Sequence, residues 1–399
     1  MNSKANKKHI CIDVTNIVPG VGGAGGGIAT YAKNLVIGLD HLLEELHGDL
    51  QLSILGHPEF LRNLPLRQVK KVYRKVNNQS LFSRFFWLNF HLPNFLKENQ
   101  VDLLHRVIPE LPFRSPCKNV VTLHDFMFDF YLRNRTLSNY LGLKEKAKFL
   151  LLRGSMRATL KSKNMILVPS DSIAKELKIR FSKRKLQIQV TKLATQMIPK
   201  KAGIGNHKLE KRGESKEIKI GYIAGYYPHK GHKKAVQLMK LLLNQNRGKN
   251  IHLFFRGSVV YPEYFLEVKD LVEKEGLKKH VFFEEFESAI TVQEIYQKYD
   301  VTLLLSEYEG FGLPVLESQT YKKPVLCSDI PVFRENLQDS AFFIPQQIRE
   351  AEVEKLLNVL HDNEYLEFLS ETGVKNSSKY SWQETCQLTL SSYLKLLNS

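Results

Sequence analysis

Short apolar runs alternate with amphipathic stretches along the first half of the chain. Runs typical of buried strands occur at residues 9–14, 51–55, 102–107, 120–124 and 165–169. Residues 28–39 and 170–179 have helical spacing, and the second begins with a Ser-Asp-Ser cap. Strands that alternate with helices predict a parallel α/β sheet.

The second half repeats this pattern. The predicted strands are residues 218–223, 251–255, 280–283, 301–305, 324–328 and 341–344. The predicted helices are residues 233–244, 263–274, 291–298, 352–360 and 382–397.

A chain of 399 residues is longer than one hydrophobic core usually supports, so two domains are expected. We predict a first Rossmann-like, doubly wound domain over residues 1–200 and a second over residues 217–380. Residues 201–216, rich in charge and glycine, form the predicted linker, and residues 381–399 the predicted closing helix.

The net charge of +17 is unevenly distributed. Residues 1–200 hold 32 Lys and Arg against 14 Asp and Glu, whereas residues 201–399 hold 26 against 27. A basic first domain suggests an anionic membrane surface, a nucleic acid or a phosphorylated substrate, with solubility alone as the alternative. No zinc-finger, RNA-recognition or helix-turn-helix signature is present, so no nucleic-acid partner is expected.

Cysteine spacing and hydropathy point to the cytoplasm. The four cysteines form no metal-binding spacing, and Cys11 and Cys327 lie in apolar runs as small buried side chains would. No apolar run approaches the roughly 20 residues of a membrane span. The polar start, Met1 to His9, does not resemble a signal peptide.

The strongest chemical signal is residues 306–317, which follow an apolar strand and lead into a helix near Pro314. Gly310 and Gly312 allow backbone to approach a ligand closely. Glu309 and Glu317 bracket the turn, and an ionised carboxylate accepts hydrogen bonds from two sugar hydroxyls. The alternative is an ordinary turn with glutamates that face solvent.

Three further segments carry candidate chemistry. Lys230 ends the Gly/Pro turn 221–231 before a helix, where it can neutralise a diphosphate. His124 closes a buried strand, and a core histidine with a satisfied hydrogen bond is the alternative. The glycine run 22–27 lies between the first strand and the first helix, where it fits a ligand-approaching turn or a flexible loop.

Residues 306–317 resemble the E-x7-E signature of glycosyltransferase family 4, whose members are retaining enzymes of the GT-B fold, with two Rossmann-like domains facing across a cleft. The resemblance implies that Glu317 binds the ribose hydroxyls of a nucleotide and that Glu309 lies at the transferred sugar. The backbone that holds the sugar and diphosphate would be Gly310, Phe311, Gly312 and Leu313.

The other segments resemble the same family. Lys230 matches its diphosphate-binding lysine, and His124 matches a histidine that reaches the donor sugar from the first domain. Gly26 and Gly27 match its Gly-Gly loop in the donor site. Where many members carry an arginine, this chain has Tyr226. Arg256 is a candidate substitute for that contact, with an ordinary surface arginine as the alternative.

The predicted function is sugar transfer from a UDP- or GDP-linked donor to a glycan or lipid-linked acceptor in cell-surface polysaccharide or lipopolysaccharide synthesis. No Asp-x-Asp motif is present, so neither a metal nor another cofactor is expected. Basic and aromatic residues share the stretch 61–90, which suits peripheral attachment to an anionic membrane at its inner face, or else a buried helix with a solvated basic face.

Three alternatives stay open. The chain could be a catalytically silent relative that binds only a glycan or a partner, because Tyr226 replaces the usual arginine. It could transfer sugar to a protein or a soluble acceptor. It could also perform another reaction on a nucleotide sugar, such as epimerisation.

Overall fold

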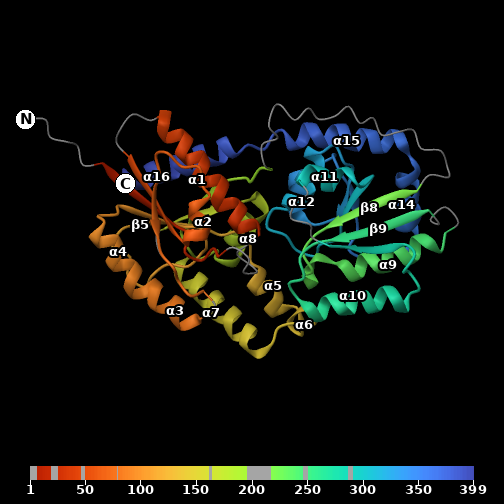
Figure 1. Ribbon diagram of the computed structural model, residues 1–399, viewed down its shortest axis with the longest axis horizontal. Coiled ribbons are helices and arrows are strands. Elements are labelled where there is room, and N and C mark those ends of the chain that lie inside the picture. Colours follow the sequence, from red (N-terminus) through yellow and green to blue (C-terminus); the bar gives the residue numbers. More distant parts are fainter. Residues whose placement is uncertain are drawn as a thin grey trace, which may run out of the picture. The chain divides into compact units, whose positions relative to one another are not determined.

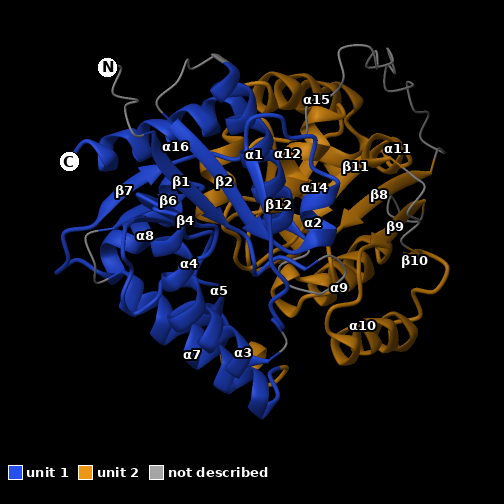
Figure 2. Cartoon of the chain, turned by 60° about the vertical axis from the view of Figure 1, so that its left-hand side comes forward, with its two compact units in different colours: residues 1–133, 141–193, 381–399 blue, residues 134–140, 194–380 orange. Residues whose placement is uncertain are grey.

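The computed structural model describes residues 7–18, 26–45, 50–78, 80–160, 164–195, 217–245, 250–285 and 291–399. The predicted linker 201–216 and most of the glycine run 22–27 lie outside these residues. The chain divides into two compact units (Figure 2). Unit 1 holds residues 1–133, 141–193 and 381–399, and unit 2 holds residues 134–140 and 194–380.

The described part of unit 1 contains a seven-stranded parallel sheet with the order β3-β2-β1-β4-β5-β6-β7. Its strands are β1 Lys8–Asp13, β2 Leu50–Gly56, β3 Lys70–Tyr73, β4 Leu103–Arg106, β5 Lys118–Thr122, β6 Met165–Val168 and β7 Gln187–Val190. Its helices are α1 Gly27–Glu45, α2 Pro58–Arg62, α3 Leu81–Phe86, η1 Trp87–His91, α4 Leu92–Glu98, α5 Met127–Arg133, α7 Leu143–Thr159, α8 Asp171–Arg180 and α16 Trp382–Leu397.

The described part of unit 2 contains a six-stranded parallel sheet with the order β10-β9-β8-β11-β12-β13 (Figure 1). Its strands are β8 Ile218–Ile223, β9 Ile251–Arg256, β10 Val281–Glu284, β11 Val301–Leu304, β12 Val325–Ser328 and β13 Phe342–Ile344. Its helices are α6 Arg135–Ser138, η2 Pro228–Lys230, α9 His232–Leu243, α10 Pro262–Lys274, α11 Val292–Gln297, α12 Leu313–Thr320, α13 Pro331–Leu337, α14 Glu350–His361 and α15 Asn363–Ser377.

The two strands of unit 1 that the hydrophobic pattern did not predict are the edge strands β3 and β7. β3 has the sequence Lys-Lys-Val-Tyr and β7 has Gln-Ile-Gln-Val, and neither contains a buried residue. Edge strands are commonly polar because one side of the backbone faces water. They therefore lack the continuous apolar run that marks a central strand of a parallel sheet.

Two stretches of the predicted first domain, residues 134–140 and 194–200, group with unit 2. The first of them is not adjacent in sequence to the rest of that unit. Residues 134–140 are held there by a polar cluster in which the Tyr140 hydroxyl donates to Glu267 on α10 and accepts from Lys233 on α9. The Tyr140 ring also packs edge-on against Tyr264, 5.4 Å away.

The final helix, α16, packs against α1 and against β5 and β6 in unit 1. Gly38 on α1 makes this packing close, because a Cβ there would lie 2.4 Å from the Cys386 sulfur. The Tyr393 hydroxyl lies 2.5 Å from His105 Nδ1 on β4. The closing helix is therefore an integral part of the unit 1 core.

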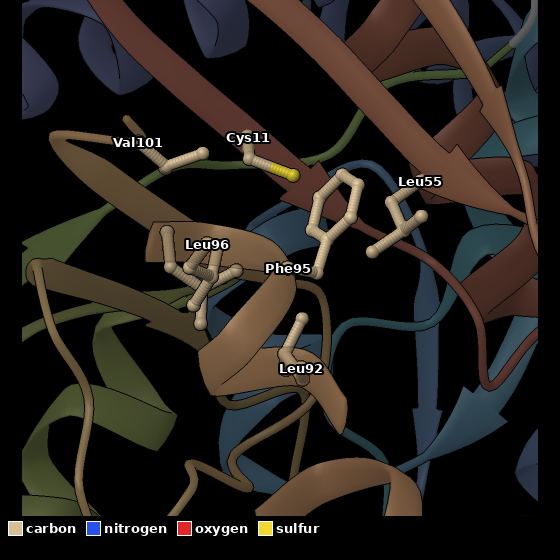
Figure 3. Close-up of a cluster of buried hydrophobic side chains, with 7 residues drawn as sticks. Cys11, Leu55, Leu92, Phe95, Leu96 and Val101 are labelled. Atoms are coloured by element: carbon tan, nitrogen blue, oxygen red, sulfur yellow. The ribbon is translucent and has the colours of Figure 1, made fainter. Parts of the chain in front are cut away.

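A cluster of apolar side chains joins α4 to the sheet of unit 1 (Figure 3). Leu92, Phe95 and Leu96 from α4 pack against Cys11 on β1 and Leu55 on β2. Cys11 and Cys327 are both fully buried, as the sequence predicted.

Shortening one side chain of this cluster should destabilise unit 1. Leu96 is fully buried, so Leu96→Ala should lower the free energy of unfolding by about 2–5 kcal/mol. Leu151→Ala on α7 is the matched control, because Leu151 is 60% exposed and its truncation should change stability by less than about 0.5 kcal/mol. Chemical denaturation measures both, and equal losses would contradict the assignment of this core.

Candidate functional site

The chemical motifs of unit 2 follow two strands that are adjacent in the sheet but distant in the sequence. β8 pairs with both β9 and β11, so the strand order reverses between β8 and β11. In open parallel sheets, ligands bind beside the carboxyl ends of the strands at such a reversal. Residues 224–231 follow β8 and residues 305–312 follow β11, so both predicted motifs lie at this point.

Lys230 and Glu309 meet between these two loops. Lys230 Nζ donates a hydrogen bond to Glu309 Oε1 at 2.6 Å, and the Ser306 hydroxyl donates to the same oxygen at 2.8 Å. The Lys230 and Glu309 side chains are only 17% and 8% exposed. The structure thus brings together the two residues that the family resemblance assigns to the diphosphate and to the transferred sugar.

The backbone around Lys230 is held against the loop after β11 by three further contacts. The buried Tyr222 hydroxyl donates to the Lys230 carbonyl and accepts from the Leu305 N–H at 3.0 Å. The Glu307 N–H donates to the His229 carbonyl at 2.8 Å. Gly231 has a φ of 73°, and a Cβ there would lie 2.1 Å from the Leu305 carbonyl oxygen.

The glycine-rich turn leads into α12 at a position that only glycine can occupy. Gly312 has a φ of 90°, and a Cβ there would lie 2.5 Å from the Phe333 ring on α13. Phe311 is buried, and its carbonyl accepts from Asn336 at 2.8 Å. Gly310 and Leu313, at either end of this turn, are partly exposed. The turn therefore has one well-defined conformation.

Glu317 lies on α12 and is paired with a tyrosine that the motif did not reveal. Its Oε2 accepts a hydrogen bond from the Tyr296 hydroxyl at 3.1 Å. The same hydroxyl also lies 2.9 Å from the Pro314 carbonyl oxygen, which shares this donor. The Tyr296 ring stacks on Tyr321 at 5.5 Å. Burial raises the pKa of the Glu317 carboxyl to about 7, and the Tyr296 hydrogen bond only partly opposes this.

Tyr226, at the position of the expected arginine, is a core residue. Its ring is buried, stacks on His232 at 4.6 Å and packs edge-on against Phe265 at 4.6 Å. Burial raises the pKa of its hydroxyl, so this side chain stays neutral. It cannot supply a second cation.

Arg256, the candidate substitute, ends β9 beside the same loop. Its guanidinium is buried and donates from Nη1 to Glu284 Oε2 on β10 at 2.8 Å. This ion pair uses Nη1 and favours a structural role, whereas Nε and Nη2 are buried without a hydrogen-bond partner among the described residues. A donor contact by Arg256 stays a prediction.

His124 lies in unit 1, just after β5. Its Nε2 lies 3.0 Å from the Val107 carbonyl, which can only accept, so Nε2 carries the proton and Nδ1 is the free acceptor. Burial lowers the pKa of His124 to about 4, against the opposing effect of the Val107 hydrogen bond. The imidazole is therefore neutral at pH 7.

Gly26 and Gly27 lie at the start of α1 in the same unit. A Cβ at either position would meet no atom within 4 Å, so space does not require glycine there. Tyr31, one turn further along α1, packs edge-on against the His124 ring at 4.9 Å. Tyr31 thus connects the predicted glycine loop with the predicted histidine.

Two site residues were not predicted from the sequence. Tyr222 and Tyr296 position Lys230 and Glu317, but they lie 8 and 21 residues away from them. Their only sequence signal is a tyrosine within an apolar element, which is also typical of an ordinary core. Among the described residues, no group of three or more His, Cys, Asp or Glu side chains is arranged to hold a metal ion.

Residues 206–376 match the family model for glycosyl transferases group 1. This group 1 segment contains Lys230, Arg256, Glu309 and Glu317. The candidate site of unit 2 therefore lies within the part of the chain that has the family's sequence pattern, whereas His124 and Gly26 lie outside it.

Two curated relatives and one solved structure are informative. The serotype-specific mannosyltransferase WbdA of Escherichia coli is 30% identical over 41% of this chain, which spans only 19% of WbdA. The O-antigen chain mannosyltransferase B of Escherichia coli is 24% identical over 64% of this chain and 66% of its own length.

The sucrose-phosphate synthase structure from Thermosynechococcus elongatus superposes with a TM-score of 0.70, 15% identity and coverage of 98% of this chain and 100% of that one. The predicted fold, two Rossmann-like domains of the GT-B type, is therefore confirmed.

Two glycines with the same backbone conformation test the packing of the Lys230 loop. Gly231 and Gly276 have φ values of 73° and 71°, but a Cβ at Gly276 would meet no atom within 4 Å. Gly276→Ala should cost about 1–2 kcal/mol of stability from backbone conformation alone. Gly231→Ala should cost about 2–5 kcal/mol because it also displaces the Leu305 carbonyl. Equal losses in chemical denaturation would refute the close approach.

The raised pKa of Glu317 predicts a pH-dependent stability. The unfolded carboxyl ionises near its ordinary value of 4.5, whereas the folded one holds its proton to about pH 7. The folded state should lose about 3 kcal/mol relative to the unfolded state as the pH rises from 4 to 8. Glu317→Gln should lack this loss. Parallel denaturation profiles for wild type and variant would contradict the burial of this carboxyl.

Proposed function

We propose that this chain is a retaining, metal-independent glycosyltransferase of family 4. It moves a sugar from a nucleotide diphosphate sugar, UDP- or GDP-linked, to a glycan or lipid-linked acceptor in cell-surface polysaccharide or lipopolysaccharide synthesis. The observation that supports this most is the Lys230–Glu309 pair, which lies at the strand reversal of unit 2 and inside the group 1 segment. The names of the two mannosyltransferase relatives support the class of pathway.

The site residues have complementary roles in this reaction. The diphosphate carries the departing negative charge, and Lys230 supplies a partly buried cation beside the start of α9. Backbone N–H groups at the start of a helix add positive potential there. Glu317 accepts hydrogen bonds from ribose hydroxyls once it ionises, and Glu309 accepts them from the transferred sugar. Binding thus replaces the Lys230–Glu309 contact by contacts of each residue with the donor.

The transfer step needs no metal and no protein base. The bond between the sugar C1 and the phosphate oxygen breaks, and its electron pair stays on that oxygen. The acceptor oxygen bonds to C1 from the same face, and its proton passes to the leaving phosphate oxygen. Fixed cations and helix N–H groups lower the barrier because they stabilise the charge that develops on the diphosphate. His124, neutral at pH 7, would offer Nδ1 as an acceptor to a sugar hydroxyl.

A second candidate function is ligand binding without transfer. The buried Tyr226 favours it, because the cation found in many family members is absent from this position. A chain of this kind would bind the nucleotide sugar but would release no nucleotide when acceptors are added.

The proposed location is the cytoplasm, at the inner face of the membrane that holds a lipid-linked acceptor. None of the described helices is both long and apolar enough to cross a bilayer. Attachment through a surface of the folded chain is part of this proposal.

Lys230→Ala should lower kcat by about 100-fold or more, because it removes one fixed charge from the developing diphosphate. The matched control is Lys240→Ala, which removes a lysine of the following helix, α9, that pairs with Glu275 instead. The assay follows nucleotide release from UDP-, GDP-, ADP- and TDP-sugars with cell-surface glycan acceptors, with and without EDTA. Unchanged release by the Lys230 variant would contradict the proposed site, and loss of activity in EDTA would contradict metal independence.

Donor binding is measured separately by thermal shift. A donor at about 100 times its dissociation constant should add about 2.7 kcal/mol of stability, and Glu317→Ala should abolish the shift. A shift without nucleotide release in the presence of acceptors would favour the second candidate function.

A further inference from the structure

Five phenylalanines form an exposed cluster on unit 1. This aromatic patch consists of Phe82, Phe85, Phe86, Phe90 and Phe113. Phe82 is 72% and Phe113 is 77% exposed, and the other three are also exposed. The rings contact one another in sequence, with centroids 4.4 Å apart for Phe82 and Phe86, 5.2 Å for Phe86 and Phe90, and 5.9 Å for Phe85 and Phe113.

The opposite side of the same helical segment is anchored in the core. Trp87 and Leu88 of η1 pack against the cluster that joins α4 to the sheet. The Phe113 N–H donates to Asn89 Oδ1 at 3.0 Å, which holds the second chain segment of the patch in place. Arg84 donates to the Glu110 carboxylate at 3.0 Å. The aromatic patch is therefore a fixed surface that the fold does not use for its own packing.

A contiguous apolar surface of this kind marks a contact with a membrane or with another protein. Single exposed apolar side chains are ordinary, but five rings that touch one another leave a large apolar area in water. Its burial would release free energy in proportion to that area. The identity of the partner follows from the charges around the patch.

The chain segment that carries most of the patch has only positively charged side chains among its Asp, Glu, Lys and Arg residues. From Phe60 to Lys97 there is no Asp or Glu, whereas eight Lys and Arg side chains occur there. Arg114 directly follows Phe113 and is exposed. The neighbouring helix α7, which lies beside α3 in both views (Figures 1 and 2), exposes Leu150 and Leu151 together with Lys148.

Aromatic rings carried by a chain segment that has basic but no acidic residues suit an anionic bilayer. Rings insert at the level of the headgroups, and Lys and Arg side chains pair with lipid phosphates. A second copy of this chain is disfavoured, because a symmetric contact would place the same positively charged segment against itself. An acidic protein could match the charge, so the test includes it as an outcome.

We propose that the aromatic patch is the membrane-docking surface of this protein and that it inserts into the headgroup region of an anionic bilayer. The proposal rests on the proposed function in one respect, because a lipid-linked acceptor places the substrate at that surface. It deepens that function by naming the surface that carries the enzyme to its acceptor.

The test compares two double variants of the full chain in vesicle co-sedimentation. Phe82→Ser with Phe86→Ser removes two rings from the patch. Leu266→Ser with Phe368→Ser removes two side chains of unit 2 that are 57% and 49% exposed, and it serves as the matched control. The vesicles contain either phosphatidylglycerol or only phosphatidylcholine, each at low and high salt.

The wild-type chain should bind phosphatidylglycerol vesicles strongly, bind phosphatidylcholine vesicles weakly, and lose affinity at high salt. The patch variant should bind about 100-fold more weakly to phosphatidylglycerol, while the control variant should bind like wild type. Misfolding of the variants is excluded in one of two ways. Both variants should show the same unfolding transition as wild type, or both should keep the thermal shift with a donor nucleotide sugar.

Three outcomes would overturn the proposal. The wild-type chain could fail to bind vesicles, or the patch variant could bind them as strongly as wild type. The wild-type chain could also bind only a second copy of itself or an acidic protein. Size-exclusion chromatography identifies the self-association case. Because vesicle binding needs neither donor nor acceptor, it can succeed when sugar transfer is absent, and the two proposals can fail separately.

Discussion

A partly buried ion pair between Lys230 and Glu309 joins the two loops on which the candidate site depends. Removing a charge from water is costly, so such a pair is rarely kept for stability alone. Here the Ser306 hydroxyl satisfies the same carboxylate oxygen, and Tyr222 ties the backbone of one loop to the other. The surrounding residues thus fix a cation and an anion beside the strand reversal. A donor could exchange this ion pair for two new contacts, one between its diphosphate and the cation and one between its hydroxyl groups and the anion.

The sequence predicted the central strands and the chemical loops because both follow from local rules. A central strand of a parallel sheet is buried on both faces and reads as a continuous apolar run. A glycine beside a carboxylate before a helix signals a turn that approaches a ligand. These rules mark the two loops, and the resemblance to glycosyltransferase family 4 singles out Lys230 and Glu309 within them. The strand order explains why Lys230 Nζ lies 2.6 Å from Glu309 Oε1 although the residues are 79 positions apart.

The remaining parts depend on contacts between distant residues. The edge strand β3 has a charged, half-exposed sequence with no strand pattern of its own. It forms a strand because it pairs with β2. The grouping of residues 134–140 with unit 2 rests on contacts of Tyr140 with α9 and α10, which no local pattern reveals. Arg256 could be an exposed cation by sequence, and only the position of Glu284 on the next strand shows that it is paired.

The central claim is that the Lys230 and Glu309 loops form the donor site. The most direct measurement is a crystal structure of the chain with a UDP- or GDP-sugar bound. The account predicts the diphosphate within hydrogen-bond distance of Lys230 Nζ, the ribose hydroxyls on Glu317, and the Lys230–Glu309 contact replaced by contacts with the donor. A nucleotide sugar bound elsewhere, with the Lys230–Glu309 pair intact, would contradict it.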